Sequence, residues 1–323
     1  MKLFIKLSFF FIFLFLGLIV LITISSSFIE KKYASFKLKN NTKYLVVGHS
    51  HPECAFNDSL IPNLKNISQS GESYFYNYLK IKPIIRENPS IDVIFIEFTN
   101  NQITESMNEW IWGDKYISNR FPKYSSYMNL DDNLMLFKNN PSAYSNALSL
   151  STRKKISRIF GKDLNFSTKI GGYLYLDRDK TDSIINSIES SKQTTSLVLP
   201  VKKDISETNL SYLDALIKFS QKNNKKVFLI RSPQHKKYSG YSNEDKYMVI
   251  VKSRYTDIEY LDFSKFPLSN SKYGDLEHLN YKGAKIFSEW FANLLNDGLL
   301  VKENKQGYIN EKIKARTHNT VYN

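Results

Sequence analysis

The sequence predicts an α/β domain with a mostly parallel sheet, preceded by one apolar helix at the amino terminus. Three observations lead to this fold class. Residues 7–24 carry no charge. Beyond them, short runs rich in β-branched and aromatic residues alternate with stretches of helical spacing. Strands that alternate with helices form βαβ units, which build a parallel sheet between layers of helices.

The composition is that of a folded protein with no cysteine-based framework. The 323 residues are 42% hydrophobic and 24% charged, which separates the chain from disordered sequences. A single cysteine excludes a disulfide framework and any multi-cysteine zinc or iron–sulfur site. We expect no cofactor.

The chain is strongly basic, with a net charge of +14 from 45 Lys and Arg against 31 Asp and Glu. Such a charge can indicate nucleic acid, a membrane surface or an acidic polymer as partner. The basic residues are dispersed in short pairs, and no motif that reads RNA or DNA is present. We therefore expect a basic, solvated surface and no nucleic-acid partner.

The first element is the apolar segment 7–24. As a helix it spans about 27 Å, close to the hydrocarbon core of a bilayer. Small residues at 25–27 leave a cleaved signal peptide open, but the apolar stretch is longer than such peptides have, which favours an uncleaved signal anchor. Positive charge on both sides leaves the orientation open. The basic amino terminus and the lack of a second span favour a single-pass protein with its bulk outside the cytoplasm, periplasmic or extracellular.

Five segments are expected to form strands. YLVV at 44–47, DVIFIEF at 92–98, KVFLIR at 226–231 and IEYLDF at 258–263 are short apolar runs, as in strands buried on both faces. Residues 66–68 form a very short further candidate.

Four helices are expected between and after these strands. Residues 72–86 are apolar enough for a helix, which Pro83 should end or kink. Residues 209–223 and 282–296 place apolar side chains at helical spacing, and 243–253 also favour a helix.

These elements divide the chain into three parts. Residues 1–32 are the anchor with its flanks, 33–300 are the α/β domain, and 301–323 are a basic tail expected to be disordered or loosely docked. Residues 102–205 are an insertion to which the pattern assigns no structure.

Polar residues that suit ester chemistry follow the predicted strands. A parallel sheet binds ligands beyond the carboxyl ends of its strands. Ser50 follows the first strand and Asn100 follows strand 92–98, while Asp275 and His278 stand three apart before the last helix. A serine hydroxyl needs a base, a histidine base needs a carboxylate, and the developing oxyanion needs donors.

In these residues the sequence resembles the SGNH (GDSL-like) hydrolases. Gly48-His49-Ser50 corresponds to the first block, G-D-S, with His49 in place of aspartate. Gly71 in NISQSGES corresponds to the second block. Phe98-Thr99-Asn100-Asn101 keeps the asparagine of G-x-N-D but lacks its glycine and aspartate. Asp275-Leu276-Glu277-His278 matches D-x-x-H. The resemblance covers about 44–101 and 225–296.

The resemblance implies a three-layer, flavodoxin-like fold and a catalytic set. Ser50 would be the nucleophile, His278 the base and then the acid, and Asp275 the residue that orients His278. The backbone N–H groups of Ser50 and Gly71 and the side chain of Asn100 would form the oxyanion hole.

Further residues near these blocks are candidates for substrate contact: His49 and His51 beside the nucleophile, and Arg231 and His235 after a strand, where they suit an anionic group. A metal is not expected, because the two flanking histidines lack a convincing third ligand.

With a membrane anchor, the resemblance implies an ester hydrolase acting on O-acyl, in particular O-acetyl, groups of a cell-envelope polysaccharide or glycan. Two alternatives stay open. One is a polysaccharide O-acetyltransferase with the same triad. The other is a non-catalytic scaffold of envelope assembly that keeps the fold.

Overall fold

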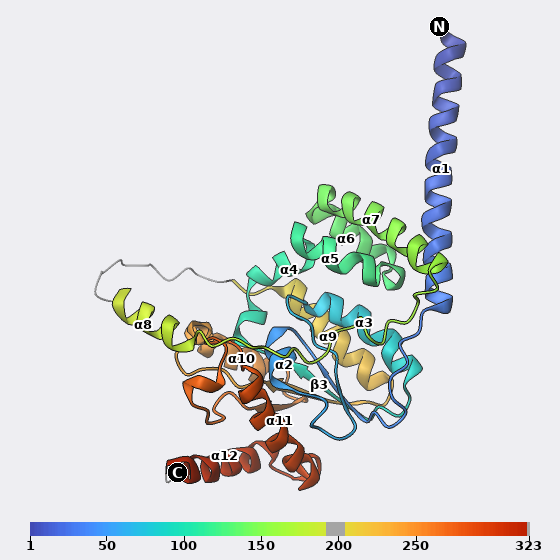
Figure 1. Cartoon of the computed structure of the whole chain (residues 1–323). Coiled ribbons are helices and arrows are strands. Elements are labelled where there is room, and N and C mark those ends of the chain that lie inside the picture. The colour runs from blue at the N-terminus through green and yellow to red at the C-terminus, as the bar shows by residue number, and fades with distance from the viewer. Residues whose placement is uncertain (192–203, 322–323) are drawn as a thin grey trace. The chain divides into compact units, whose positions relative to one another are not determined.

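The structure is a computed structural model that describes residues 1–191 and 204–321 (Figure 1). The chain divides into two compact units. Unit 1 comprises Met1–Phe36 and Ile111–Lys169, and unit 2 comprises Lys37–Trp110 and Ile170–Asn323. Part of the insertion that the sequence left without structure therefore belongs with the amino-terminal helix.

Unit 1 is helical. It contains α1 (Lys2–Tyr33), α5 (Asp114–Tyr124), η3 (Ser125–Tyr127), α6 (Leu130–Asn139) and α7 (Pro141–Phe160). The apolar part of α1 is exposed and long enough to cross a membrane, a property that signal sequences share. The carboxyl end of α1 packs against α7, where the buried Glu30 accepts hydrogen bonds from Arg158 and Ser126. Only the amino-terminal part of α1 therefore lacks protein neighbours within this unit.

Unit 2 contains a five-stranded, fully parallel sheet in the order β2-β1-β3-β4-β5. This confirms the α/β class and the flavodoxin-like order of strands. β2 and β3 lie on opposite sides of β1, so the strand order reverses at the β1/β3 pair, which is paired from Tyr44↔Val93 to Val47↔Ile96. The strands are β1 (Tyr44–Val47), β2 (Leu64–Asn66), β3 (Val93–Glu97), β4 (Lys226–Arg231) and β5 (Glu259–Asp262).

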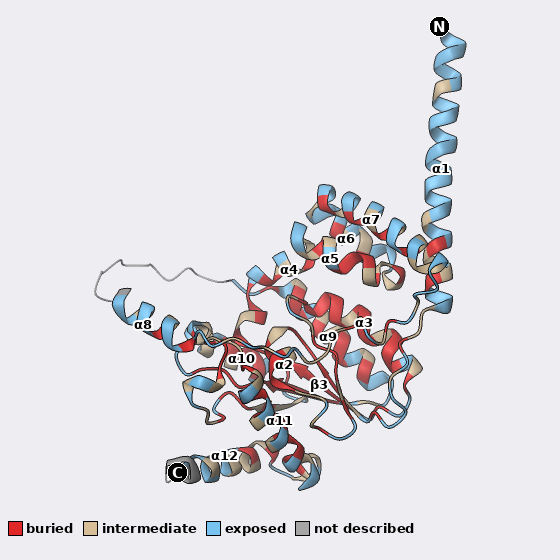
Figure 2. Ribbon diagram, in the orientation of Figure 1, coloured by how far each residue is buried: buried red, intermediate tan, exposed pale blue. Residues whose placement is uncertain are grey.

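Helices cover both faces of this sheet and complete the three layers. On one face, Phe56, which follows α2, and Phe287 and Phe291 of α11 form one core cluster with Phe95 and Phe228 of the strands. On the other, α3 packs against α9, and Figure 2 shows that the sheet and its flanking helices hold most buried residues. The helices are α2 (Ser50–Ala55), α3 (Tyr74–Glu87), α9 (Glu207–Lys222), α10 (Glu244–Arg254) and α11 (Tyr281–Asn296).

Shorter and peripheral helices complete the described chain. They are η1 (Asn100–Ile103), η2 (Glu105–Asn108), α4 (Glu109–Trp112), α8 (Thr181–Ser191), η4 (Ser239–Asn243), η5 (Asn270–Lys272), η6 (Leu299–Val301) and α12 (Lys305–Val321).

The structure corrects three local predictions. The second strand lies at Leu64–Asn66, two residues before the predicted 66–68. Helix α3 continues through Pro83 to Glu87, because the buried side chains of Ile84 and Ile85 offset the lost backbone hydrogen bond. The basic tail is helical rather than disordered, and Ile309 of α12 is fully buried in the core cluster that includes residues of the sheet.

Candidate active site

The turn after β1 places Ser50 at the start of α2. Gly48 precedes it, and a Cβ atom at this position would lie 2.5 Å from Cβ of Glu97 and 2.9 Å from Cγ of Pro52. Only glycine fits this close approach. Because Ser50 is the first residue of α2, its backbone N–H has no acceptor within the helix. The turn thus presents a hydroxyl and a backbone N–H without an intrahelical acceptor at the carboxyl end of β1.

Ser50, His278 and Asp275 form a continuous chain of hydrogen bonds. His278 Nε2 lies 2.7 Å from Ser50 Oγ, and His278 Nδ1 lies 2.9 Å from Asp275 Oδ1. A carboxylate can only accept from Nδ1–H, so Nε2 of the neutral imidazole carries the lone pair that faces the serine hydroxyl. This is the tautomer that a serine-activating base requires.

Asp275 is held as a carboxylate by several donors. Its Oδ1 also accepts the backbone N–H groups of Glu277 at 2.8 Å and His278 at 2.9 Å, and its Oδ2 pairs with Arg178. Burial opposes ionisation, but the hydrogen bond from His278 and these other partners together lower the pKa of Asp275 to about 2. Asp275 is therefore charged throughout the neutral range and can stabilise a protonated His278.

Arg178 reaches the triad from the insertion. Residues 170–180 run in extended form along unit 2, fixed by the backbone hydrogen bonds Gly172 N–H to Ser68 C=O at 3.1 Å and Leu174 N–H to Glu53 C=O at 2.8 Å. Gly171, at φ +110°, has its Cβ position 2.3 Å from the Ser68 carbonyl oxygen, so this strap needs glycine there. The sequence offered no signal for Arg178, because the segment has neither helical nor strand periodicity.

The loop that carries Gly71 is tied to the nucleophile turn. Gln69 N–H donates to the Gly48 carbonyl at 3.1 Å, and Ser70 N–H donates to the Glu53 carboxylate of α2 at 2.7 Å. Gly71 itself has φ +69°, a conformation that favours glycine. The expected backbone donor thus lies in a loop that two hydrogen bonds fix to the segment bearing Ser50.

Asn100 is held by a charged network. One N–H of its amide donates to Glu244 Oε2 at 2.6 Å, and its Oδ1 accepts from Arg231 at 3.1 Å. Asn100 is 1% exposed, so its amide is buried in both of these contacts. Arg231 is 4% exposed and is bonded to Glu244 at 2.9 Å and to Asp262 at 3.0 Å. The two acids thus occupy the guanidinium that the sequence suggested for an anionic substrate, and Arg231 orients Asn100.

His49 lies inside the protein and does not face solvent. Its side chain is fully buried, Nδ1 accepts the His51 backbone N–H at 3.4 Å as the amino-terminal cap of α2, and Nε2 lies 3.2 Å from Thr99 Oγ1. Burial first, and then the neighbouring His51 and His278, lower the pKa of His49 well below its usual value. His49 therefore acts as a neutral structural link between the strand ends of β1 and β3.

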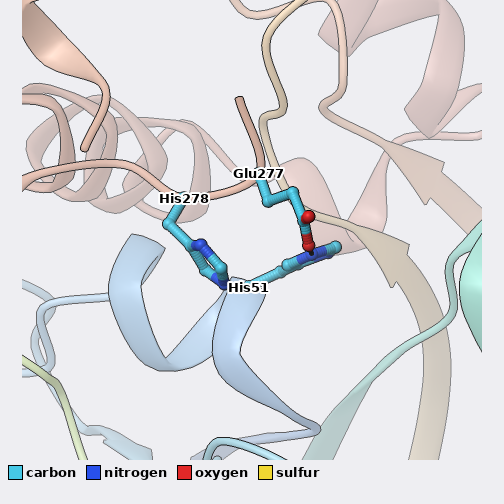
Figure 3. Close-up of side chains that lie close together, drawn as sticks. All are labelled: His51, Glu277 and His278. Atoms are coloured by element: carbon cyan, nitrogen blue, oxygen red, sulfur yellow. Dashed lines mark ion pairs between the residues drawn. The ribbon is translucent and has the colours of Figure 1, made fainter. Parts of the chain in front are cut away.

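His51 is also buried, but it lies against the triad. Its ring centroid is 5.3 Å from that of His278, and Gln234 Nε2 lies 2.8 Å from His51 Nδ1. His51 Nε2 faces the Glu277 carboxylate at 3.6 Å, an ion-pair distance (Figure 3), and forms no hydrogen bond within the described part of the chain. Burial lowers the pKa of His51, although Glu277 opposes this. The result is a neutral ring held between Gln234 and Glu277 beside the ring of His278.

His51, Glu277 and His278 also offer ligand atoms within 4.8 Å of one another. Glu277 supplies the third candidate ligand that the two histidines beside Ser50 do not provide. Both nitrogens of His278 are engaged, however, one with Asp275 and one with Ser50. A metal bound through His278 would have to break one of these hydrogen bonds, so a metal centre and the triad exclude each other.

Glu97 closes the floor of the site at the end of β3. Its carboxyl group accepts the backbone N–H of Ser232 at 3.0 Å and bonds the Ser232 hydroxyl at 2.7 Å. Burial raises the pKa of Glu97 to about 8, although the Ser232 bonds and Arg231 oppose this. Glu97 is therefore largely protonated at neutral pH and adds little negative charge beneath the triad.

His235 lies at the wall of a cavity of about 800 Å³ beyond β4 and β5. Its Nδ1 accepts the Lys237 backbone N–H at 3.1 Å, and Nε2 lies 3.1 Å from Asn270 Oδ1. Both ring nitrogens are thus used within the protein. Arg231 lines the same cavity, so the two residues suggested for substrate contact do share one concavity.

Comparisons with known proteins add little to this geometry. A family model that carries no description of function matches residues 161–300. No curated protein matches the sequence. Among solved structures, the chain is similar to a Bacteroides fragilis crystal structure named "putative acylhydrolase", with 10% sequence identity and a TM-score of 0.33, over 87% of this chain and 93% of that chain. A likeness this distant indicates no activity for this chain.

Proposed function

We propose that the chain is a serine-dependent acyl-ester enzyme that works through an acyl-Ser50 intermediate. The supporting observation is the hydrogen-bonded sequence Ser50–His278–Asp275, with separations of 2.7 Å and 2.9 Å in the orientation that proton transfer from serine requires.

The proposed reaction has two halves. Ser50 Oγ attacks the ester carbonyl carbon while His278 Nε2 takes its proton, and Asp275 stabilises the resulting imidazolium. The alcohol leaves with that proton, which gives an acyl-serine. Water then attacks the acyl carbon as His278 again accepts a proton; the bond to Ser50 Oγ breaks, His278 returns its proton to that oxygen, and the carboxylic acid leaves. The N–H groups of Ser50 and Gly71 and the second amide N–H of Asn100 are the proposed donors to the oxyanion.

As substrate we propose an O-acetylated glycan of the cell envelope, with hydrolysis as the reaction. The exposed apolar part of α1 supports a membrane location. If a sugar hydroxyl replaces water in the second half, the same residues carry out O-acetyl transfer. The two reactions are separated by supplying a glycan acceptor to the acetylated enzyme and measuring free acetate against acetylated sugar.

The test of the proposal is intact-mass spectrometry after incubation with p-nitrophenyl acetate. We expect the mass of one added acetyl group on the wild type and none on Ser50→Ala, whose turnover should fall by about 10³-fold or more. Ser59→Ala, an exposed serine on the loop after α2, is the matched control and should behave as wild type. A folded wild type that neither acquires an acetyl group nor reacts with a fluorophosphonate probe would instead support the scaffold.

We further propose that α1 is retained as an anchor and that unit 2 lies outside the cytoplasm. Thr23 Oγ1 lies 3.3 Å from Thr152 Oγ1 of α7, so the helical packing of unit 1 reaches into the apolar segment. The protein should stay with membranes in carbonate, and a carboxyl-terminal reporter should be active only outside the cytoplasm. A soluble product that starts near residue 26 would refute retention.

A further inference from the structure

The cavity beyond β4 and β5 lies at the same edge of the sheet as the triad. It is about 800 Å³, within the range of small-molecule sites. None of the triad residues lines it. Its walls come from the end of β4, the segment 234–236, the start of α10, and the loop 264–273. A ligand held there would therefore lie beside the ester-cleaving groups and leave them free.

The charge of the wall selects an anion. Arg231, Lys236 and Lys265 line the cavity against one acid among the lining residues, Glu244. Glu244 is already paired with Arg231. The two lysines are exposed, and neither forms an ion pair with any residue that the structure describes. Because Asp262 also pairs with Arg231, the three cations face two acids, and the excess of one positive charge is carried by the exposed lysines.

One buried acceptor points to a ligand with hydroxyl groups. Gln234 lines the cavity, is 2% exposed, and its Oε1 has no hydrogen-bond partner. A buried acceptor without a partner is costly, and a hydroxyl donor from a ligand would satisfy it. The Nε2 atom of the same amide lies 2.8 Å from His51 Nδ1, so Gln234 connects the cavity to the ring beside His278. Ser264, Ser269 and Tyr241 add further polar groups.

We propose that this cavity binds an anionic sugar, with a sugar hydroxyl donating to Gln234 Oε1 and the carboxylate or phosphate lying between Lys236 and Lys265. This inference rests on the proposed function, because the cavity would hold the charged residue of the glycan next to the residue that carries the ester. The substrate class is then an acidic rather than a neutral glycan.

Binding is measured by titration calorimetry on the full chain in detergent, with Ser50→Ala as background so that no turnover intervenes. The probes are trigalacturonic acid, its methyl-esterified neutral form, and glucose 6-phosphate. We expect at least one anionic probe to bind at least about tenfold more tightly than the neutral form, because each lost charged hydrogen bond is worth about a factor of ten. The stronger of the two anionic probes identifies carboxylate or phosphate as the preferred group.

The double variant Lys236→Ala/Lys265→Ala should weaken binding of the anionic probe by about tenfold or more. Lys222→Ala/Lys252→Ala removes the same charge from exposed positions on α9 and α10 and should leave affinity within about twofold. Absence of binding by both anionic probes, equal binding of the neutral form, or equal loss in both double variants overturns the inference. None of these outcomes depends on acyl transfer, so binding without an acyl-Ser50 would refute the proposed function alone.

Discussion

Asp275→Asn tests the triad most directly, because the change keeps the shape of the side chain and removes its charge. An asparagine has one acceptor oxygen where aspartate has two. That oxygen cannot accept both from Arg178 and from the three N–H groups of Glu277 and His278 that bond Asp275 Oδ1. The ring of His278 is then free to take the other tautomer, whose Nε2–H faces Ser50. The rate of aryl acetate hydrolysis should fall by about 10⁴-fold, the scale for this tautomer error.

The same substitution carries a stability signature. In the folded chain the pKa of Asp275 falls from 3.8 to about 2, a lowering worth about 2 kcal/mol of unfolding free energy at neutral pH. Since the folded pKa is the lower one, this contribution is complete above about pH 4 and is lost as the pH falls toward 2. Chemical denaturation should show Asp275→Asn to be less stable at pH 7, with the difference from wild type narrowing below pH 4.

Asp257→Asn, an exposed change in the turn before β5, is the control for both measurements and should alter neither. Activity of Asp275→Asn within tenfold of wild type would refute the role assigned to Asp275. A stability difference that does not change with pH would refute the electrostatic reason given for it.

Three further predictions follow from neighbouring contacts. Arg178→Met removes a partly exposed ion pair and should lower kcat by less than about tenfold; a loss as large as that of Asp275→Asn would give Arg178 a direct part in the reaction. Asn100→Ala should lower kcat by about 10²–10³-fold with little change in KM. If Asn101→Ala shows this loss and Asn100→Ala does not, the oxyanion donor is Asn101. Glu97→Gln imitates the protonated acid. Because folding raises the pKa of Glu97 from 4.5 to about 8, the wild type should become less stable in thermal unfolding as the pH rises from 4.5 to 8, and the variant should lose less stability over the same range. Parallel losses in both proteins would show that Glu97 does not titrate in this range.

The strands could be predicted because parallel strands are buried on both faces and therefore consist of apolar runs. The segments 92–98 and 226–231 show this clearly, and the structure has strands at Val93–Glu97 and Lys226–Arg231. The shortest strand was misplaced because three residues carry too little pattern to fix a register. The helix over 72–86 was predictable, but its continuation through Pro83 was not, because the burial that offsets the lost hydrogen bond comes from tertiary contacts.

The site was predictable to the extent that its residues follow strands. Ser50 and Asn100 stand at strand ends, and the spacing of Asp275 and His278 allows direct pairing within one turn. The pairing of Arg231 was not predictable, because its partner Glu244 belongs to α10 and its partner Asp262 ends another strand. From the sequence alone, nothing indicates that this cation is already paired.

The base of the triad depends on long-range contacts more than the nucleophile does. Ser50 is positioned by its own strand and helix, whereas Asp275 and His278 lie on a loop with no strand before them. That loop is fixed by backbone hydrogen bonds: Gly274 N–H donates to His278 C=O at 2.8 Å, Lys180 N–H to Gly274 C=O at 3.0 Å, and His235 N–H to Leu276 C=O at 3.1 Å. The strap that carries Arg178 and the segment that carries Gln234 thus hold the loop from two sides. A change in either segment should therefore alter the Ser50–His278 geometry before it alters the sheet.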